Sequence, residues 1–275
     1  MRLAGSTLTF SRAPLPEAAG ALARLGFTHV ELAAVEGWAH VAPSRLVADF
    51  RAEAERVRAA CAAAGLTPVG INAGLGATDD PAEQLGAAGA VFRLAAALGV
   101  PVVTLPAGPP GPSAPGSQAG VDLRPAVARL RPLLEEAQRQ AVTLAVETHI
   151  GSLTEQPDAA AALCRALPGL RLTLDASHFW AGPAQGNGWE AAVPFVAHVH
   201  LRDAGFGGWG EIQVWPGRGT VDWAGVSAAL AAAAYRGAWV VEYIDTLPVT
   251  PEGTVAQAAA EMARQARAGW PPAQR

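Results

Sequence analysis

Four side chains that can carry protons or bind metal ions stand at the ends of short apolar runs in the second half of the chain. Glu147 ends LAVE, Asp175 ends LTLD and Glu242 ends WVVE, and His200 follows AHV in the same way. A carboxylate that is buried without a partner costs several kcal/mol. The four positions therefore predict a shared environment that neutralises three carboxylates.

A divalent metal ion would provide such an environment. Three carboxylates gathered without a cation repel one another and become partly protonated. Three carboxylate oxygens and one imidazole suit manganese, magnesium, cobalt or zinc, whereas softer metals prefer thiolates. We predict one divalent metal ion bound by Glu147, Asp175, His200 and Glu242. For Glu147 alone, the alternative is an ion pair with a core arginine. Such a pair does not explain four polar residues at the ends of four successive strands.

The segments that would position these residues follow a repeating order. A stretch rich in Ala, Leu and Arg ends in Gly, and an apolar run begins shortly afterwards, as in RLGFTHVEL and ALGVPVVTL. Gly is the expected left-handed cap of a helix, and such runs are typical of strands buried on both faces. Eight runs are predicted as strands: 2–8, 28–34, 68–73, 101–106, 142–148, 171–176, 196–202 and 238–244. A helix can follow most of them, and the sixth is the weakest, with only 189–194 available.

Strands that alternate with helices predict an α/β fold with a parallel sheet. Eight such units in 275 residues predict a (β/α)8 TIM barrel, as a single domain over 1–275. A doubly wound open sheet is the alternative, but no GxGxxG follows the first run. In a closed barrel the carboxyl ends of the strands form one rim, where active sites of this fold lie. The four residues would end four successive strands at that rim.

Two long connections are expected at the same rim, over 106–122 and 203–221. Long loops in compact domains are usually functional or disordered. Five tryptophans fall in strand-to-helix connections and should gather there: Trp38, Trp180, Trp189, Trp209 and Trp215. Aromatic rings can pack on the apolar face of a sugar and exclude water, and the alternative is that they only seat the loops.

Further side chains near the rim are candidate substrate contacts. His178 follows Asp175 by three residues and is predicted to bind substrate or a second metal ion. Arg202 would bind a substrate oxygen or a phosphate, or pair with Asp203. His198 alternates with His200 and is expected to pack one layer deeper in the core. The other candidates, each with a structural alternative, are His149, Glu31, Asn72, Trp38, Trp180 and Arg218.

Composition excludes several classes of function. The formal charge is −4, which argues against a nucleic-acid partner. No apolar segment approaches ~18 residues, and the first residues lack a signal-peptide apolar region, so we expect a cytoplasmic protein with no membrane partner. Cys61 and Cys164 are expected to be small core residues without metal-site spacing. The oligomeric state is left open, a homo-oligomer included.

The motifs resemble those of the xylose-isomerase-like barrel superfamily, which includes sugar and sugar-phosphate isomerases and epimerases, inosose dehydratase-type enzymes and endonuclease IV. The matching segments are VETH, LDASH, HVHLRDA, VVEYID and PGRGTVDW, and the resemblance spans nearly the whole chain. In such families the positions matching Glu147, Asp175, His200 and Glu242 hold one divalent metal ion. The resemblance also implies that Glu147 and Glu242 are the catalytic acid/base groups, as in the ketose epimerases.

The chain departs from individual members of that superfamily. Tagatose- and allulose-type epimerases usually have Gly-Glu and a downstream Arg after the histidine of the seventh strand, where this chain has HVHLRDAGFGG. The extra histidines of the trinuclear endonuclease IV are missing from INAGLG, TLPAGPP and GWGEIQVW. Arg218 occupies the variable position of the PGxG motif, where the superfamily often has Glu. This replacement would change the charge near a substrate.

These features predict a metal-dependent isomerase or epimerase that acts on a sugar, sugar phosphate or related polyol through an enediolate. Either Glu147 or Glu242 would remove the proton beside a metal-polarised carbonyl. Return of a proton to the opposite face gives epimerisation, and its return to the neighbouring carbon gives isomerisation. Loss of a β-hydroxyl would instead give an inosose-like dehydratase. The alternative from another class is a non-catalytic barrel that binds a small carbohydrate.

Overall fold

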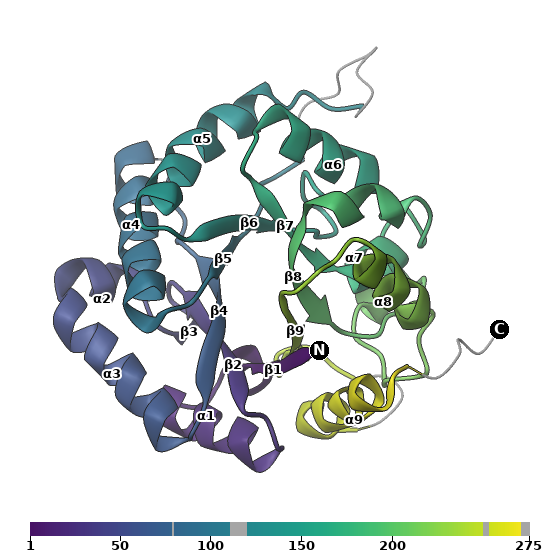
Figure 1. Ribbon diagram of the computed structural model, residues 1–275, viewed down its shortest axis with the longest axis horizontal. Helices are drawn as coiled ribbons and strands as arrows, with labels where there is room; N and C mark the ends of the chain where they lie inside the picture. The colour runs from purple at the N-terminus through teal and green to yellow at the C-terminus, as the bar shows by residue number, and fades with distance from the viewer. Residues whose placement is uncertain (79, 111–119, 250–252, 271–275) are drawn as a thin grey trace.

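Eight parallel strands close into a barrel, and the helices form a ring around it (Figure 1). The computed structural model describes residues 1–78, 80–110, 120–249 and 253–270. In this part of the chain the barrel strands are β1 Arg2–Ser6, β2 His29–Val35, β4 Thr67–Gly74, β5 Val102–Leu105, β6 Thr143–Glu147, β7 Arg171–Asp175, β8 Val196–Leu201 and β9 Ala238–Val241. Strand β1 pairs with both β2 and β9, which closes the sheet. The predicted single-domain TIM barrel is confirmed.

A further strand, β3 Ala39–His40, was not expected from the sequence. It pairs antiparallel with the end of β2, at Ala34 and Val35. Two residues are too few to show the period-two alternation by which a strand is recognised. The short hairpin carries Trp38 in its turn.

The helices cover the outside of the barrel, and at least one follows each barrel strand, as the alternation predicted. They are α1 Leu15–Arg24, α2 Pro43–Ala48, α3 Phe50–Ala63, α4 Pro81–Leu98, α5 Arg124–Arg139, α6 Pro157–Ala166, α7 Ala176–Ala181, α8 Trp223–Ala232 and α9 Val255–Ala268. The described residues also form three 3-10 helices, at Thr7–Phe10, Trp189–Phe195 and Gly208–Glu211. The expected weak helix at 189–194 is therefore a 3-10 turn, and the short α7 precedes it.

The barrel interior differs from the layer between strands and helices. Between the two layers the core is apolar, and it includes the free thiols Cys61 and Cys164, whose pKa values burial raises to about 11 and about 12. The strands also carry buried polar side chains, among them Glu31, Asp175, His198 and His200, and a small separate apolar cluster of Ala4, Val69, Ala238 and Val240. None of the described helices is long and apolar enough to cross a membrane.

The two long connections leave the carboxyl ends of their strands. The 203–221 loop is described throughout, and it contains the 3-10 helix Gly208–Glu211. Most of the 106–122 connection lies outside the described residues, which resume at Gly120. Of the two long connections, the 203–221 loop is therefore the one whose contacts at the rim can be followed throughout.

Candidate metal centre and active site

Closure of the barrel brings the four proposed metal ligands together. Glu147 ends β6, Asp175 ends β7 and pairs in register with His200 of β8, and Glu242 directly follows β9. The Nδ1 atom of His200 lies 2.7 Å from Oε1 of Glu147 and 3.3 Å from Oε2 of Glu242. One ligand atom from each of the four side chains lies within 4.8 Å of the others. The residues thus converge on one point at the carboxyl end of the barrel.

This arrangement fits a divalent cation. Metal–oxygen bonds of about 2.1 Å place opposite ligands of an octahedron about 4.2 Å apart, and the donor atoms here already lie within 4.8 Å. Three carboxylates and an imidazole are the hard and borderline donors that magnesium, manganese, cobalt and zinc accept. The donor set and its spacing therefore suit one ion of this class.

The charges in this cluster are strongly coupled. Burial and repulsion from Glu242 raise the pKa of Glu147, although His200 opposes them. Burial also acts to raise the pKa of Glu242, but the nearby His200 and Arg202 lower it overall. Burial would lower the pKa of His200, yet the charges of Glu242, Glu31 and Glu147 hold it well above the usual value. The surrounding carboxylates therefore favour a positive charge at this position, which the protonated ring of His200 or a cation can provide.

Arg202 is the arginine that neutralises part of this charge. Its guanidinium lies 2.5 Å from Oδ2 of Asp175 and 3.9 Å from Oε2 of Glu242, and both carboxylates are buried. Ser177 donates its hydroxyl and its backbone N–H to Oδ1 of Asp175, which also caps α7. Burial would lower the pKa of Arg202, but Asp175 and the glutamates raise it. Arg202 therefore pairs with Asp175 and not, as the sequence alternative had it, with Asp203.

Asn72 orients the second glutamate. Its side-chain amide, from β4, donates to Oε1 of Glu242 over 3.0 Å. The other oxygen of Glu242, Oε2, is thereby left facing His200. Asn72 thus stands beside the centre as well as on the wall of the cavity above it.

A cavity of about 410 Å³ opens beside the four proposed metal ligands. Glu147 and Glu242 are on its floor, and the proposed substrate contacts Asn72, His149, His178, Arg202 and Trp38 also line it. Much of the remaining wall is apolar, and includes Leu8, Val35, Trp209, Ile244 and Leu247. Small-molecule sites usually occupy about 300–1,000 Å³ and combine an apolar lining with a few polar groups. The cavity has this character.

Two histidines and a tryptophan stack on one side of the cavity. The rings of His149 and His178 lie 4.0 Å apart, and Trp209 lies 5.6 Å from the first and 6.0 Å from the second. Nδ1 of His178 accepts the backbone N–H of Ile150, and its Nε2 lies 3.0 Å from Arg202. Burial and the charge of Arg202 hold the pKa of His178 well below its usual value. A neutral imidazole therefore faces the cavity next to the guanidinium.

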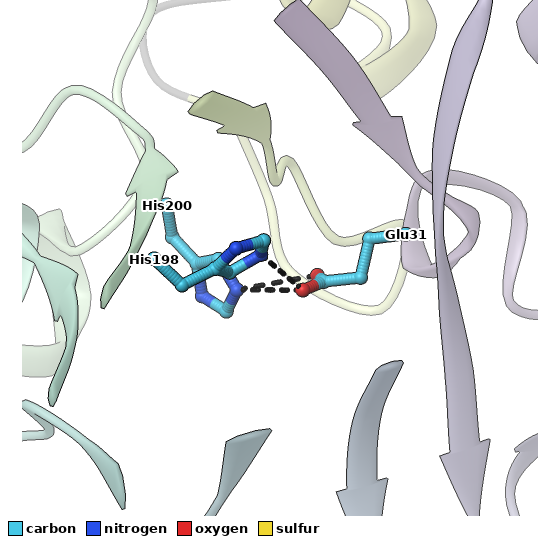
Figure 2. Close-up of side chains that lie close together, drawn as sticks. All are labelled: Glu31, His198 and His200. Atoms are coloured by element: carbon cyan, nitrogen blue, oxygen red, sulfur yellow. Dashed lines mark hydrogen bonds and ion pairs between the residues drawn. The ribbon is translucent and has the colours of Figure 1, made fainter. Parts of the chain in front are cut away.

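Three of the candidate substrate contacts lie away from this cavity. Glu31 is fully buried and contacts His198 and His200 beneath the ligands (Figure 2). Trp180 is 5% exposed and packs against Trp189, with ring centroids 6.1 Å apart. Arg218 is exposed on the 203–221 loop. Of the five tryptophans expected on this face, only Trp38 and Trp209 line the cavity among the described residues.

Asp203 anchors the 203–221 loop next to the centre. Its Oδ2 accepts the N–H groups of Gly217 and Gly219 over 2.8 and 3.0 Å, and its Oδ1 accepts that of Ala204. Burial nevertheless raises the pKa of Asp203 to about 6, against the opposing effect of these hydrogen bonds. A Cβ atom on Gly219 would overlap Oδ1 of Asp203, so the second glycine of PGRG is required by close approach. We call Asp203 with the N–H groups it binds the loop clamp.

The sequence did not assign a role near the centre to Ser177 or His198. Ser177 contacts both Asp175 and Arg202, and His198 contacts Glu31. For His198 the alternation with His200 in HVH was a usable signal, because side chains two apart on a strand point to the same side. For Ser177 the only signal was its place two residues after a helix-capping aspartate.

Comparison with known proteins places the chain in a family. A family model described as xylose isomerase-like TIM barrel matches residues 19–266. No curated protein matches the chain.

Several solved structures share the fold at low sequence identity. The 3-keto-D-glucoside 4-epimerase of E. coli is 19% identical, covers 98% of this chain and 99% of its own, and has a TM-score of 0.71. The D-psicose 3-epimerase of Clostridium cellulolyticum H10, solved with D-tagatose, is 16% identical, with coverage of 98% and 99% and a TM-score of 0.72. A xylose isomerase-like TIM barrel protein of Mycobacterium smegmatis, solved with magnesium, is 19% identical, with coverage of 96% and 94% and a TM-score of 0.72. At these identities the likeness establishes the fold alone.

Proposed function

Since the chain belongs to the xylose isomerase-like TIM barrel family, we propose that it is a divalent-metal-dependent epimerase or isomerase of a sugar or related polyol. One observation carries the proposal. Two glutamates, an aspartate and a histidine from four successive strands converge within 4.8 Å, and the two glutamates line a cavity of small-molecule size. The magnesium bound by the Mycobacterium smegmatis protein and the D-tagatose bound by the Clostridium epimerase support a site that takes a metal ion and a sugar.

Glu147, Asp175, His200 and Glu242 would hold the cation. When bound, it would act as a Lewis acid toward adjacent hydroxyl and carbonyl oxygens of the substrate and make the neighbouring C–H more acidic. Arg202 holds the carboxylate of Asp175 in place through their ion pair, and Asn72 turns Oε2 of Glu242 toward the centre. These contacts orient the ligands before any substrate enters.

The proton transfers fall to the two glutamates. Both line the cavity, and they reach it from β6 and from the end of β9, which β7 and β8 separate. One carboxylate takes the proton from the carbon beside the carbonyl, and the other returns a proton to the opposite face. This arrangement favours epimerisation. Return by the same carboxylate to the neighbouring carbon would give isomerisation, and loss of a β-hydroxyl would give dehydration.

The other cavity residues would position the sugar. The neutral imidazole of His178 and the guanidinium of Arg202 lie 3.0 Å apart on the cavity wall and can hydrogen-bond substrate hydroxyls. His149 stacks on His178. Trp38 and Trp209 are about half exposed at the mouth, where their rings can cover the apolar face of a sugar and exclude water.

Solvent exchange tests the proposal even though the substrate is not identified. The protein, loaded with Mn²⁺ or Mg²⁺, is incubated in D2O with a panel of ketoses, aldoses, keto-glycosides, sugar phosphates and cyclitols. NMR then follows deuterium uptake at the carbon beside the carbonyl, together with the formation of epimer, isomer or dehydrated product. Uptake by at least one member supports the proposal and identifies the outcome. A metal-loaded protein that binds sugars but exchanges no proton would instead indicate a non-catalytic binding barrel.

A single variant then tests the acid/base assignment. Glu147→Gln should lower turnover by roughly 10²–10⁴-fold, because the amide cannot move the proton. Its circular dichroism spectrum should stay that of the wild type. Glu135→Gln, on the exposed face of α5, is the matched control and should retain full turnover. Full turnover by Glu147→Gln would contradict the assignment.

A further inference from the structure

A second polar group lies inside the barrel beneath the proposed metal ligands. Glu31, from β2, reaches across to the two histidines of β8 (Figure 2). Its Oε1 lies 2.8 Å from Nε2 of His198 and 3.3 Å from Nε2 of His200, and its Oε2 lies 3.2 Å from Nε2 of His200. All three side chains are at most 1% exposed. The carboxylate therefore faces the edge of His200 that points away from the cavity.

The two edges of the His200 ring face different partners. Nε2 faces Glu31, whereas Nδ1 faces Glu147 and Glu242. A buried carboxylate accepts hydrogen bonds, so it favours a proton on the nitrogen nearest to it. Glu147 lies 2.7 Å from Nδ1 and makes the same demand there, but a cation held by Glu147 and Glu242 would take that place. The proton would then stay on Nε2, and the lone pair on Nδ1 would point to the ion. A carboxylate behind a metal-bound imidazole fixes the ring and its tautomer in this way.

Glu31 and His198 have little freedom to take another role. Neither lines the cavity, so a substrate in that cavity does not reach them. Gly70 of β4 packs directly against them: a Cβ atom there would meet the His198 ring at 2.8 Å and Oε1 of Glu31 at 3.0 Å. The close contacts between Glu31 and the two imidazoles are hydrogen-bond distances rather than the sides of an open pocket. One ligand atom from each of Glu31, His198 and His200 also lies within 4.8 Å of the others, a spacing that a metal ion accepts, so the number of ions per chain separates a supporting role from a second ion site.

We propose that Glu31 is a positioning residue that presents Nδ1 of His200 to the metal ion, and that His198 holds Glu31 in place through Oε1. The inference rests on the proposed function, because it assumes that His200 is a metal ligand. Glu31 thereby supports the ion and does not contact the substrate.

Metal affinity tests the role of Glu31 directly. Isothermal titration calorimetry with Mn²⁺ and Mg²⁺ on metal-free protein should show a roughly 10–100-fold loss of affinity in Glu31→Gln, as for other carboxylates behind metal-bound histidines. Glu53→Gln is the matched control, since Glu53 is also a buried carboxylate, 4% exposed and paired with Arg56 far from the centre. Its metal affinity should change less than twofold. Equal affinities of Glu31→Gln and wild type would overturn the inference.

A measurement on the wild type keeps the inference testable if Glu31→Gln does not fold. In Mg²⁺-loaded protein labelled with ¹⁵N-histidine, two-bond ring correlations report which nitrogen of each of the six histidines carries a proton. His200 should be protonated on Nε2, and a proton on Nδ1 would overturn the inference. Elemental analysis should give one divalent ion per chain, whereas a second ion lost in Glu31→Gln would make Glu31 a ligand instead.

The outcomes separate this inference from the proposed function. A wild type that binds no divalent ion in the calorimeter would remove both. A wild type that binds the ion, matched by an equally tight Glu31→Gln, would remove only the positioning role and leave the proposed chemistry standing.

Discussion

Two neighbouring regions of the rim bury carboxylates and stabilise them by different means. In the loop clamp, Asp203 accepts backbone N–H groups from its own loop, at Ala204, Gly217 and Gly219. In the candidate metal centre, Glu147, Asp175 and Glu242 come from different strands and face side-chain charges, chiefly Arg202 and His200. In the loop clamp, the hydrogen-bonding capacity of the carboxylate is met by backbone N–H dipoles that are part of the fold. The centre depends on charge, and an added cation would complete it.

The contrast shows why only one of the two regions suits chemistry. Backbone N–H groups cannot leave, so the clamp serves to fix the 203–221 loop beside the cavity. Carboxylates that are held by charged partners can exchange those partners for an ion or a proton. Perturbed titratable groups gathered in a cleft are the usual mark of a functional site. Four experiments would test this contrast, and their expected effects decrease in the order given.

Removal of Arg202 should cause the largest loss of stability. Arg202 and Asp175 are 2% and 0% exposed, and breaking a buried pair typically costs about 3–5 kcal/mol because one charge is left uncompensated. Urea denaturation of Arg202→Ala in metal-free buffer measures the change. Arg264→Ala, which breaks the exposed pair with Glu261, is the control and should cost at most about 1 kcal/mol. Equal costs for the two variants would mean that charge does not hold the centre together.

The loop clamp should make the free energy of unfolding depend on pH. The folded pKa of Asp203 is about 6 and the unfolded value is about 3.9, so the folded state binds more protons between these values. The contribution of Asp203 to stability is therefore largest below pH 4 and falls as the pH rises through 6, by about 3 kcal/mol. Asp203→Asn cannot titrate. The stability difference between wild type and Asp203→Asn should thus shrink by that amount between pH 4 and pH 7, and a constant difference would contradict the assignment.

Divalent ions should stabilise the centre and leave the clamp unaffected. An ion at 100 times its dissociation constant adds about 2.7 kcal/mol to the free energy of unfolding. We expect Mn²⁺ to raise the melting temperature of the wild type and of Asp203→Asn by similar amounts, and EDTA to reverse both shifts. Asp175→Asn with Glu242→Gln should lose the shift. A shift that survives in this double variant would place the ion elsewhere.

The smallest effect is expected where the clamp meets Gly219. Gly219→Ala would bring a methyl group into overlap with Oδ1 of Asp203 and should cost about 1–3 kcal/mol through forced rearrangement. Gly86→Ala is the matched control, because Gly86 is exposed in α4 with nothing within 4 Å of the added carbon. It should stabilise the helix by about 0.5–1 kcal/mol. Thermal unfolding compares the two, and equal effects would show that the clamp tolerates displacement.

The barrel was predictable because its signals are local. Each of the eight apolar runs became a strand, and the polar residues at their ends could be assigned to one rim from the strand order alone. The hairpin strand β3 was missed, because Ala39 and His40 are too short a run to carry a period. The helix expected after the sixth run, at 189–194, is a 3-10 helix over Trp189–Phe195 with Pro194 inside it, and α7 follows β7 directly from its cap at Asp175.

The candidate centre was predictable only in part. The register of four strand ends suggested that Glu147, Asp175, His200 and Glu242 would meet, and they do lie within 4.8 Å. Their partners were a different matter. Arg202 was expected to bind a substrate oxygen or a phosphate or to pair with the adjacent Asp203, and its ion pair with Asp175 was not foreseen. Asp203 turned instead to the backbone of its own loop.

The amino-acid order was enough to establish the succession of strands and helices, the closed barrel that this succession requires, and the rim to which the ionisable residues belong. These follow from hydrophobic period, helix ends and chain connectivity, which are properties of short segments. The contacts between side chains emerged only on folding: Glu31 of β2 with His198 and His200 of β8, Asn72 with Glu242, and Trp180 with Trp189 away from the cavity. Most of them depend on the twist and closure of the sheet, which bring residues more than a hundred positions apart within hydrogen-bond distance.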